Sequence, residues 1–433
     1  MKTNVTRRTF LKQTSFLVAG ATVWGGVRTG RAATGPGDKV RVAIIGCNGR
    51  GMHHIAGYLS LPQAEIACIC DVDSRALAKG IAAVEKAHGR KPKAVEDLRR
   101  VLDDPEIDAV SIATPDHWHT PATVMACAAG KHVYVEKPGS HNGHESQLIV
   151  AAARKYQRVV QMGNQRRSWP WVQEAMEALH NGELGKLYFA RCWYTNHRPS
   201  LGHGRTVPPP EWLDYALWQG PAPESPYQDN VIPYNWHWFW RWGTGELGNN
   251  GVHSLDLARW GLKLDLPNRV TCGGGRYHFD DDWQTPDLAV ATFDFGDKAV
   301  VWEGQSRDPH GFEGADFGVD FYGENGTMAL TVGAKIYDLK DKLVREMAAE
   351  QKDSYSYDAL HFGNFLDCIR EGKPLHADIG EGQKSTLLCH LGNIAWRTGQ
   401  TVRFDPAAAQ LTGDNLAPDL WQRTYREGWE PKV

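Results

Sequence analysis

The first half of the chain alternates between short apolar runs and longer stretches with helical periodicity. Runs rich in β-branched residues predict strands at residues 40–45, 65–70, 109–113, 132–135 and 159–162. Helical patterns between them predict helices that begin at Met52 and that span residues 120–129 and 145–156. Strands that alternate with helices in this order predict an α/β domain with a parallel sheet.

The pattern changes after Gln165. A helix is predicted at residues 171–180, and period-two alternation predicts strands of an antiparallel sheet at residues 186–194, 288–295, 299–304 and 328–332. A Pro- and Trp-rich insertion, residues 196–242, follows the first of these strands and is too long for an ordinary connection. Its aromatic surface has two interpretations: it stacks on a sugar, or it packs against another subunit.

The first predicted strand ends in a glycine-rich turn, Gly46-Cys47-Asn48-Gly49-Arg50-Gly51. A strand, a glycine turn and a helix in this order are typical of dinucleotide binding, in which the turn holds the pyrophosphate. Asn48 replaces the usual middle glycine and tolerates left-handed backbone nearly as well. Asp71 ends the second strand about twenty residues later, where a carboxylate binds the adenosine ribose and disfavours a 2′-phosphate. The predicted cofactor is therefore NAD rather than NADP.

Parallel sheets bind their ligands at the carboxyl ends of the strands, and here these ends carry the glycine turn, Asp71, Thr114-Pro115 and Glu136-Lys137. We expect them to converge on one crevice. The chain is too long for a single core, which predicts more than one domain. The expected first domain is a Rossmann dinucleotide-binding domain at residues 38–163. An α+β domain with an open, mostly antiparallel sheet for substrate binding and oligomerisation is expected at residues 164–354. C-terminal helices and a tail at residues 355–433 are expected to pack back on the first domain.

The N-terminus has the pattern of an export signal. Arg7-Arg8 precede an apolar, glycine-containing stretch at residues 16–27 and the small residues Ala32 and Ala33. This is a twin-arginine signal, assigned to residues 1–33 and followed by a linker at residues 34–37. The mature protein is therefore predicted to be periplasmic or otherwise exported, with no membrane attachment after removal of the signal.

Charge and cysteine content narrow the class of partner. Lys plus Arg total 48 against 51 for Asp plus Glu, with no block of like charge, which disfavours nucleic acid and favours a small molecule. The eight cysteines have no zinc-ligand spacing, and the route of export argues for free thiols. No metal site is predicted.

Several motifs together resemble the Gfo/Idh/MocA family, the glucose-fructose oxidoreductase and inositol dehydrogenase group. They are the glycine turn, Thr114-Pro115 with His119 one helical turn on, residues 130–133 and Glu136-Lys137-Pro138. The resemblance covers essentially the whole mature chain. It implies cofactor contacts at these motifs and an open sheet whose faces serve substrate and subunit contact. The expected assembly is a homo-oligomer, a dimer or a tetramer.

The resemblance also implies the catalytic residues. Lys137 is expected beside the nicotinamide, with Glu136 paired either to Lys137 or to a group on the nicotinamide side. Family dehydrogenases carry Asp-x-x-x-His on a later helix; this chain keeps the histidine as His253 and has Asn249 in place of the aspartate. His253 is the candidate proton acceptor and Asn249 a hydroxyl ligand. Further candidates for the substrate side are Asp256, which is also placed to orient the His253 ring, Arg166 and Tyr194.

The predicted function is hydride transfer between a tightly held nicotinamide cofactor and a secondary alcohol, or the anomeric carbon, of a sugar or glycoside. One alternative is an NAD-dependent glycosidase that acts by transient oxidation and elimination. Lys137 counts against it, because such relatives lack the lysine of Glu-Lys-Pro. The other alternative is a sugar-binding protein with a structural cofactor, which the amide at Asn249 makes conceivable.

Overall fold

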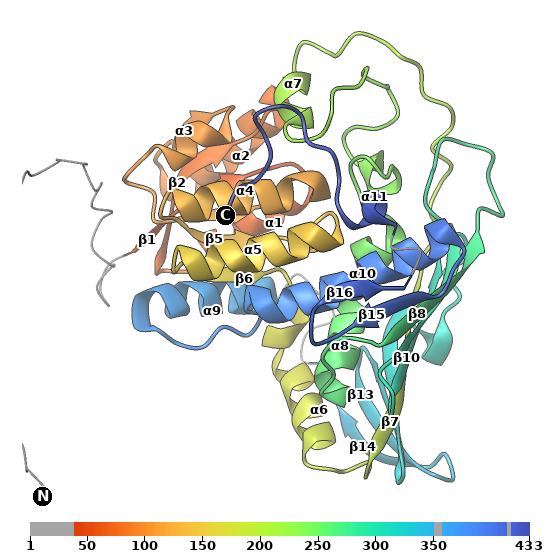
Figure 1. Cartoon of the computed structure of the whole chain (residues 1–433). Coiled ribbons are helices and arrows are strands. Elements are labelled where there is room, and N and C mark those ends of the chain that lie inside the picture. Colours follow the sequence, from red (N-terminus) through yellow and green to blue (C-terminus); the bar gives the residue numbers. More distant parts are fainter. Residues whose placement is uncertain (1–38, 350–356, 414–416) are drawn as a thin grey trace, which may run out of the picture.

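The computed structural model describes residues 39–349, 357–413 and 417–433. The predicted export signal and linker lie outside the described residues. Figure 1 shows the N-terminal sheet with its helices at the upper left and a second, larger sheet at the lower right. The fold class predicted from the sequence, a Rossmann domain followed by a mostly antiparallel sheet domain, is confirmed.

The N-terminal sheet has six parallel strands in the order β3-β2-β1-β4-β5-β6. Its strands are β1 (Val40–Ile45), β2 (Ala64–Cys70), β3 (Lys93–Val95), β4 (Ala109–Ile112), β5 (His132–Val135) and β6 (Val160–Met162). The helices between them are α1 (Arg50–Leu59), α2 (Ser74–His88), α3 (Leu98–Leu102), α4 (Asp116–Ala128) and α5 (Gly143–Lys155). The strand order reverses between β1 and β4, where doubly wound sheets open a ligand crevice.

Two helices begin earlier than their patterns predict. α1 begins at Arg50 rather than at Met52, directly inside the glycine turn. α4 begins at Asp116 rather than at residue 120, because Pro115 caps it in an extended conformation with φ −60° and ψ 156°. Both helix N-termini therefore lie immediately after a strand end, closer to the predicted crevice than expected.

The second sheet has ten strands in the order β14-β13-β12-β11-β7-β10-β9-β8-β15-β16. All neighbouring pairs are antiparallel except β7 and β10, which are parallel. The strands are β7 (Leu187–Thr195), β8 (Arg269–Gly275), β9 (Leu288–Asp294), β10 (Ala299–Gln305), β11 (Phe317–Gly323), β12 (Gly326–Thr331), β13 (Gly333–Asp338), β14 (Leu343–Met347), β15 (Val402–Asp405) and β16 (Gln410–Thr412).

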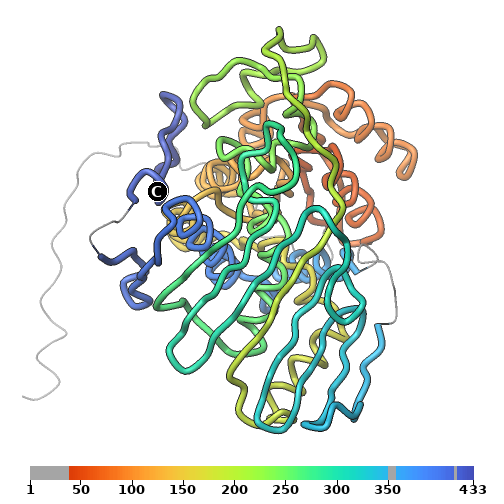
Figure 2. Tube along the Cα trace, turned by 90° about the vertical axis from the view of Figure 1, so that its right-hand side faces the viewer, coloured from red at the N-terminus to blue at the C-terminus, as the bar shows by residue number. Residues whose placement is uncertain are grey.

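Helices cover one face of this sheet. α6 (Pro170–His180), α8 (Val252–Leu262) and α10 (Ile379–Thr398) pack there, and the Cys192 thiol of β7 lies 3.4 Å from the Ser254 carbonyl oxygen of α8. Figure 2 shows the strands in front of these helices, with no helix among the described residues on the viewer's side. The sheet therefore keeps one open face.

The C-terminal residues connect both domains. α9 (Asp358–Glu371) packs against α1, where Gly57 makes room for Phe362: a Cβ at Gly57 would lie 2.5 Å from its ring. α10 packs against α5, whereas β15 and β16 extend the second sheet. The final helix is α11 (Pro418–Trp421), and Trp421 lies against Gly143 of α5.

Three general features of the described residues bear on function. None of their helices has the length and apolar character that a bilayer crossing requires. They contain no group of three or more His, Cys, Asp or Glu side chains that could hold a metal ion. All eight cysteines lie within the described residues and are free.

Four buried histidines make the folded protein sensitive to acid. Burial lowers the pKa of His54 and His361 to about 4 and that of His117 and His390 to about 3. The unfolded chain takes up these protons below about pH 6.5 while the folded chain does not, so stability is complete above that pH and falls as the pH drops toward 4.

We expect the free energy of unfolding to fall by about 1.4 kcal/mol per pH unit for each such histidine between about pH 6.5 and 4. Denaturant titrations from pH 7.5 to 5 measure this slope. His390→Asn is expected to make the slope shallower. A free energy that stays constant over this range would contradict the prediction.

Candidate active site

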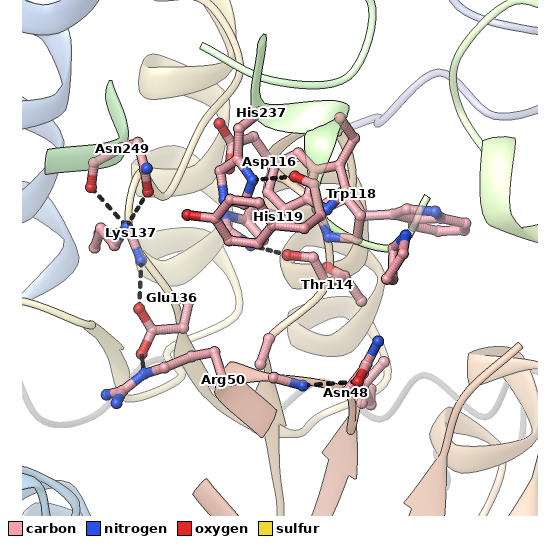
Figure 3. A pocket seen from close by; sticks show the side chains of 18 of the residues that line it. Asn48, Arg50, Thr114, Asp116, Trp118, His119, Glu136, Lys137, His237 and Asn249 are labelled. Atoms are coloured by element: carbon pink, nitrogen blue, oxygen red, sulfur yellow. Dashed lines mark hydrogen bonds and ion pairs between the residues drawn. The ribbon is translucent and has the colours of Figure 1, made fainter. Parts of the chain in front are cut away.

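A cavity of about 740 Å³ lies at the carboxyl ends of β1, β2, β4 and β5, between the two domains (Figure 3). Its walls include residues of all four strand ends, of the second domain and of the insertion at residues 196–242. The expected convergence of the strand ends on one crevice is what the structure shows.

The glycine turn brings the backbone of β1 and α1 unusually close together. Gly46 and Gly49 have φ +81° and φ +43°, which favour glycine. A Cβ at Gly46 would lie 2.8 Å from the Ala113 carbonyl oxygen, and one at Gly51 would lie 1.9 Å from the Gly46 carbonyl oxygen. The Asn48 side chain accepts a hydrogen bond from the Gly49 N–H at 3.0 Å. This bare backbone at a helix N-terminus fits the pyrophosphate of a dinucleotide.

Asp71 lies at the end of β2 and lines the cavity. Its two oxygens accept the backbone N–H groups of Cys47 at 2.7 Å and Asp73 at 2.9 Å. The Cys47 thiol also donates to Oδ2, at 3.3 Å, so these bonds fix the carboxylate beside the glycine turn and leave a lone pair of Oδ1 for a ribose hydroxyl. Burial raises the pKa of Asp71, although these backbone hydrogen bonds act in the opposite direction.

Glu136 is the centre of a buried ionic network. It accepts hydrogen bonds from Arg50 Nε at 2.8 Å, from Gln165 Nε2 at 2.8 Å and from His54 Nε2 at 3.0 Å. Arg50 also pairs with Asp358 of α9 at 2.5 Å. Burial alone would raise the pKa of Glu136, but the charge of Arg50 and the hydrogen bond from His54 hold it well below its usual range. The sequence left two partners open for Glu136, the Lys137 amine and a group on the nicotinamide side. In the structure, the Glu136 carboxylate pairs with Arg50 instead.

The Lys137 amine points away from Glu136 and toward the second domain (Figure 3). Its Nζ donates to the backbone oxygen of Asn249 at 2.7 Å and to the side-chain Oδ1 of Asn249 at 3.1 Å. Burial lowers the pKa of Lys137, while Glu136 and Asp116 act in the opposite direction. The amine is therefore held in the cavity by two neutral oxygens.

Asn249 and His253 come from consecutive helical turns. Asn249 lies in a π-helical turn, η3 (Leu247–Gly251), and His253 lies in the first turn of α8. Both line the cavity beside Lys137, as the motif predicts. Burial and the charges of Lys137 and Arg166 hold the pKa of His253 well below its usual range. The ring is therefore neutral and able to accept a proton.

Asp256 does not take the place predicted for it. It lies outside the cavity wall, and its carboxylate accepts Arg167 Nε at 2.8 Å, Arg167 Nη2 at 2.9 Å and Ser385 Oγ at 2.7 Å. These bonds tie α8 to the 3-10 turn η1 (Gln165–Ser168) and to α10. Asp256 thus positions the helix that carries His253, and its carboxylate is bonded to Arg167 and Ser385 rather than to the His253 ring.

The remaining predicted residues line the cavity in different roles. The His119 ring lies between two carbonyl oxygens: its Nδ1 is 2.6 Å from the Pro138 oxygen and its Nε2 is 2.8 Å from the Thr114 oxygen. The ring therefore stabilises this part of the cavity wall. Tyr194 accepts a hydrogen bond from Asn196 at 2.6 Å, and burial raises its pKa to about 12. Thr114, Pro115, Arg50 and Arg166 are also part of the wall.

The insertion supplies a cavity residue that the sequence analysis missed. His237 lines the cavity, and its Nδ1 donates to the Tyr234 carbonyl oxygen at 2.6 Å, which leaves Nε2 as an acceptor. Burial lowers the pKa of His237 to about 3. The ring is therefore a neutral acceptor for a ligand hydroxyl. The only signal in the sequence was its position within a Trp-rich run.

The fold and the cavity define a two-domain, dinucleotide-binding protein of the oxidoreductase class. Residues 40–164 match the family profile described as oxidoreductase family, NAD-binding Rossmann fold, and residues 199–431 match the one described as oxidoreductase family, C-terminal alpha/beta domain. The chain belongs to the Gfo/Idh/MocA family, and its N-terminal domain is an NAD-binding Rossmann domain.

The chain is similar to the following proteins at low sequence identity. The scyllo-inositol 2-dehydrogenase (NAD(+)) of Bacillus subtilis is 24% identical over 85% of this chain and 97% of its own length. A glycosyl hydrolase family 109 protein of Saccharopolyspora erythraea is 29% identical over 48% of this chain and 49% of its own length. Among solved structures, levoglucosan dehydrogenase in complex with NADH has a TM-score of 0.68 at 17% identity and covers 84% of this chain and 99% of its own.

The contact between Lys137 and Asn249 predicts how a carboxylate at position 249 would act. Asn249→Asp places a negative charge beside the amine, which is expected to raise the pKa of Lys137 by about 1–2 units. Acetic anhydride labelling of Lys137, followed by mass spectrometry across pH, measures this shift. Asn181→Asp, an exposed site at the end of α6, is the control with the same charge change. Superimposable labelling curves for Asn249→Asp and the unmodified protein would contradict the prediction.

Proposed function

We propose that the protein is an NAD-dependent oxidoreductase that acts on a secondary alcohol, or the anomeric carbon, of a sugar or glycoside. The observation that carries this proposal is the placement of the Lys137 amine and the His253 ring in the same cavity as the glycine turn and Asp71. A cofactor site and two proton-transfer groups are the parts that hydride transfer from an alcohol requires.

Each residue near Lys137 has a distinct role in the proposed reaction. NAD supplies the acceptor for the hydride that leaves the C–H bond of the substrate carbon. Lys137 binds the oxygen of the reacting hydroxyl, and the neutral His253 ring accepts its proton. The Asn249 amide and His237 Nε2 remain to bind neighbouring hydroxyls. The substrate loses one hydride and one proton and becomes a carbonyl compound.

The insertion supports a cofactor that stays bound. It docks on the residues after β2: Ser74 N–H donates to the Trp212 oxygen at 2.9 Å, Asp214 N–H donates to the Val72 oxygen at 3.0 Å, and Arg75 stacks 3.3 Å from the Trp212 ring. The C-terminal tail fastens the insertion in turn, since Arg426 N–H donates to the Pro221 oxygen at 3.0 Å. These contacts cover the side of the cavity where Asp71 lies.

Export and cofactor retention belong together in this proposal. The twin-arginine signal favours folding with the cofactor before export, and an exported enzyme has no nicotinamide pool for exchange. The cofactor is then reoxidised in place by a second sugar or another oxidised acceptor. Asp71 favours NAD over NADP. The open sheet face, where Val290 is 39% exposed, is the candidate contact between subunits of a homo-oligomer.

A glycosidase that oxidises its substrate transiently is the second candidate, because glycosyl hydrolase family 109 proteins match 35% to 48% of the chain. In that reaction the oxidised sugar would lose its aglycone by elimination, and the cofactor would end unchanged. Release of nitrophenol from nitrophenyl glycosides by the holoprotein would favour it. Lasting reduction of bound NAD by unsubstituted sugars would favour the dehydrogenase.

Lys137→Ala and His253→Ala are each expected to lower turnover by about 10²–10⁴-fold, because Lys137 binds the oxygen of the reacting hydroxyl and His253 accepts its proton. The bound NAD content is expected to stay unchanged, since neither residue builds the glycine turn. Single-turnover reduction of bound cofactor by a sugar panel measures the rate. Near-normal rates in both variants would remove these residues from the reaction.

NAD is expected to remain bound to the exported protein through purification. Denaturation and quantification of the released nucleotide measure this occupancy. Trp212→Ala is expected to lower it by removing the contact with Arg75, whereas Tyr188→Ala, an exposed aromatic residue at the start of β7 and outside the cavity wall, is expected to leave it unchanged. Empty protein that binds NAD only when millimolar amounts are added would contradict retention.

A further inference from the structure

Arg166 presents a fixed guanidinium to the cavity. It lies in the turn η1 that follows β6 and lines the cavity wall. Its guanidinium carbon is 3.8 Å from the centre of the Phe317 ring and 4.6 Å from the centre of the Trp169 ring. Stacking on aromatic faces leaves the N–H edge of a guanidinium free for a planar acceptor.

No carboxylate pairs with this guanidinium. Three arginines line the cavity, and the other two, Arg50 and Arg198, have carboxylate partners: Arg50 pairs with Glu136 and Asp358, and Arg198 with Glu246. Arg166 forms no salt bridge in the part of the chain that the structure describes. Burial lowers the pKa of Arg166 to about 10, opposed only by the distant charge of Asp316.

Arg166 is one of two cations in the cavity wall without a carboxylate partner among the described residues. Lys137 also has no salt bridge among the described residues, because its amine bonds to the neutral oxygens of Asn249. Glu136 and Asp358 share Arg50 as their ion-pair partner, and Asp116 accepts a hydrogen bond from Thr244 Oγ1 at 2.7 Å. The remaining acidic wall residues lie at the other end, around the carboxyl ends of β2 and β3; they are Asp71, Asp73, Glu96 and Asp97.

A partly buried cation without a partner is destabilising, so a ligand that neutralises it gains affinity. The charge of Arg166 reaches His253, which places the guanidinium close to the proposed reaction centre. The planar N–H edge of one guanidinium matches the two oxygens of one planar carboxylate.

We propose that the substrate is an acidic sugar whose carboxylate is bound by Arg166: a hexuronic acid, free or as a glycoside. This proposal rests on the proposed function, because it names the substrate class of the same cavity. Arg166 determines specificity and takes no part in proton or hydride transfer.

Matched pairs of substrates test the proposal. Methyl β-glucoside and methyl β-glucuronide, and the corresponding galacto pair, share stereochemistry and differ in the carboxylate. With the holoprotein, the acid of a pair is expected to be oxidised at least tenfold faster per unit concentration. Arg166→Gln is expected to lower kcat/KM for the acid by about 10- to 100-fold, the range for a hydrogen bond to a charged group, and to leave the neutral partner within a few-fold.

Arg191→Gln is the matched control. Arg191 also stacks on a phenylalanine ring, Phe312 at 4.8 Å, but lies outside the cavity wall, so its loss is expected to leave the acid-to-neutral ratio unchanged. Circular dichroism and the NAD content per chain verify that each variant is folded. Calorimetric binding of methyl β-glucuronide gives a measurement that does not depend on turnover.

The outcomes separate the two proposals. Equal rates for acid and neutral sugars, with equal losses in Arg166→Gln, would overturn the acidic substrate and leave the oxidoreductase standing. Tighter binding of glucose 6-phosphate than of glucuronate would also overturn it in favour of a phosphosugar. Glucuronide binding that needs Arg166, without reduction of bound NAD by any sugar, would support the anion site and overturn the proposed reaction.

Discussion

A single buried carboxylate, that of Glu136, joins the parts of the molecule that build the cavity. Arg50 and His54 reach it from α1, Gln165 reaches it from η1, and Arg50 extends the network to Asp358 on α9. A buried carboxylate is tolerated only when such partners surround it, and removal of one partner of a buried pair costs about 3–5 kcal/mol. The end of β5, α1 and α9 are therefore held in one fixed arrangement.

This network decides what the neighbouring Lys137 does. Because Arg50 occupies Glu136, the Lys137 amine turns to Asn249 and spans from the first domain to the second. The second domain fixes its side of the contact through Asp256, which ties α8 to η1 and α10 by its bonds to Arg167 and Ser385. Two buried carboxylates, Glu136 and Asp256, thus fix the elements that carry Lys137 and His253.

Features set by neighbouring residues could be predicted, and those set by distant partners could not. The glycine turn, the strand ends and the spacing of Asn249 and His253 are local patterns, and the structure places them together. Asp256 was assigned to the His253 ring because it lies one helical turn away, but its partner Arg167 is separated from it by 89 residues. His237 was missed for the same reason, because only the path of the insertion brings it into the cavity.

An acidic substrate explains why position 249 carries an amide instead of a carboxylate. An aspartate there would pair with Lys137, cancel one of the two unpaired cations and add a negative charge to the chamber that must receive a carboxylate. The amide keeps the hydrogen bond to the amine at 3.1 Å without that repulsion. Lys137 and Arg166 then both face the ligand as cations, and His253, whose pKa is lowered by burial and by both charges, stays neutral. For an acidic substrate, the amide at Asn249 and the unpaired Arg166 therefore serve the same purpose, because both keep the charge that faces the carboxylate positive.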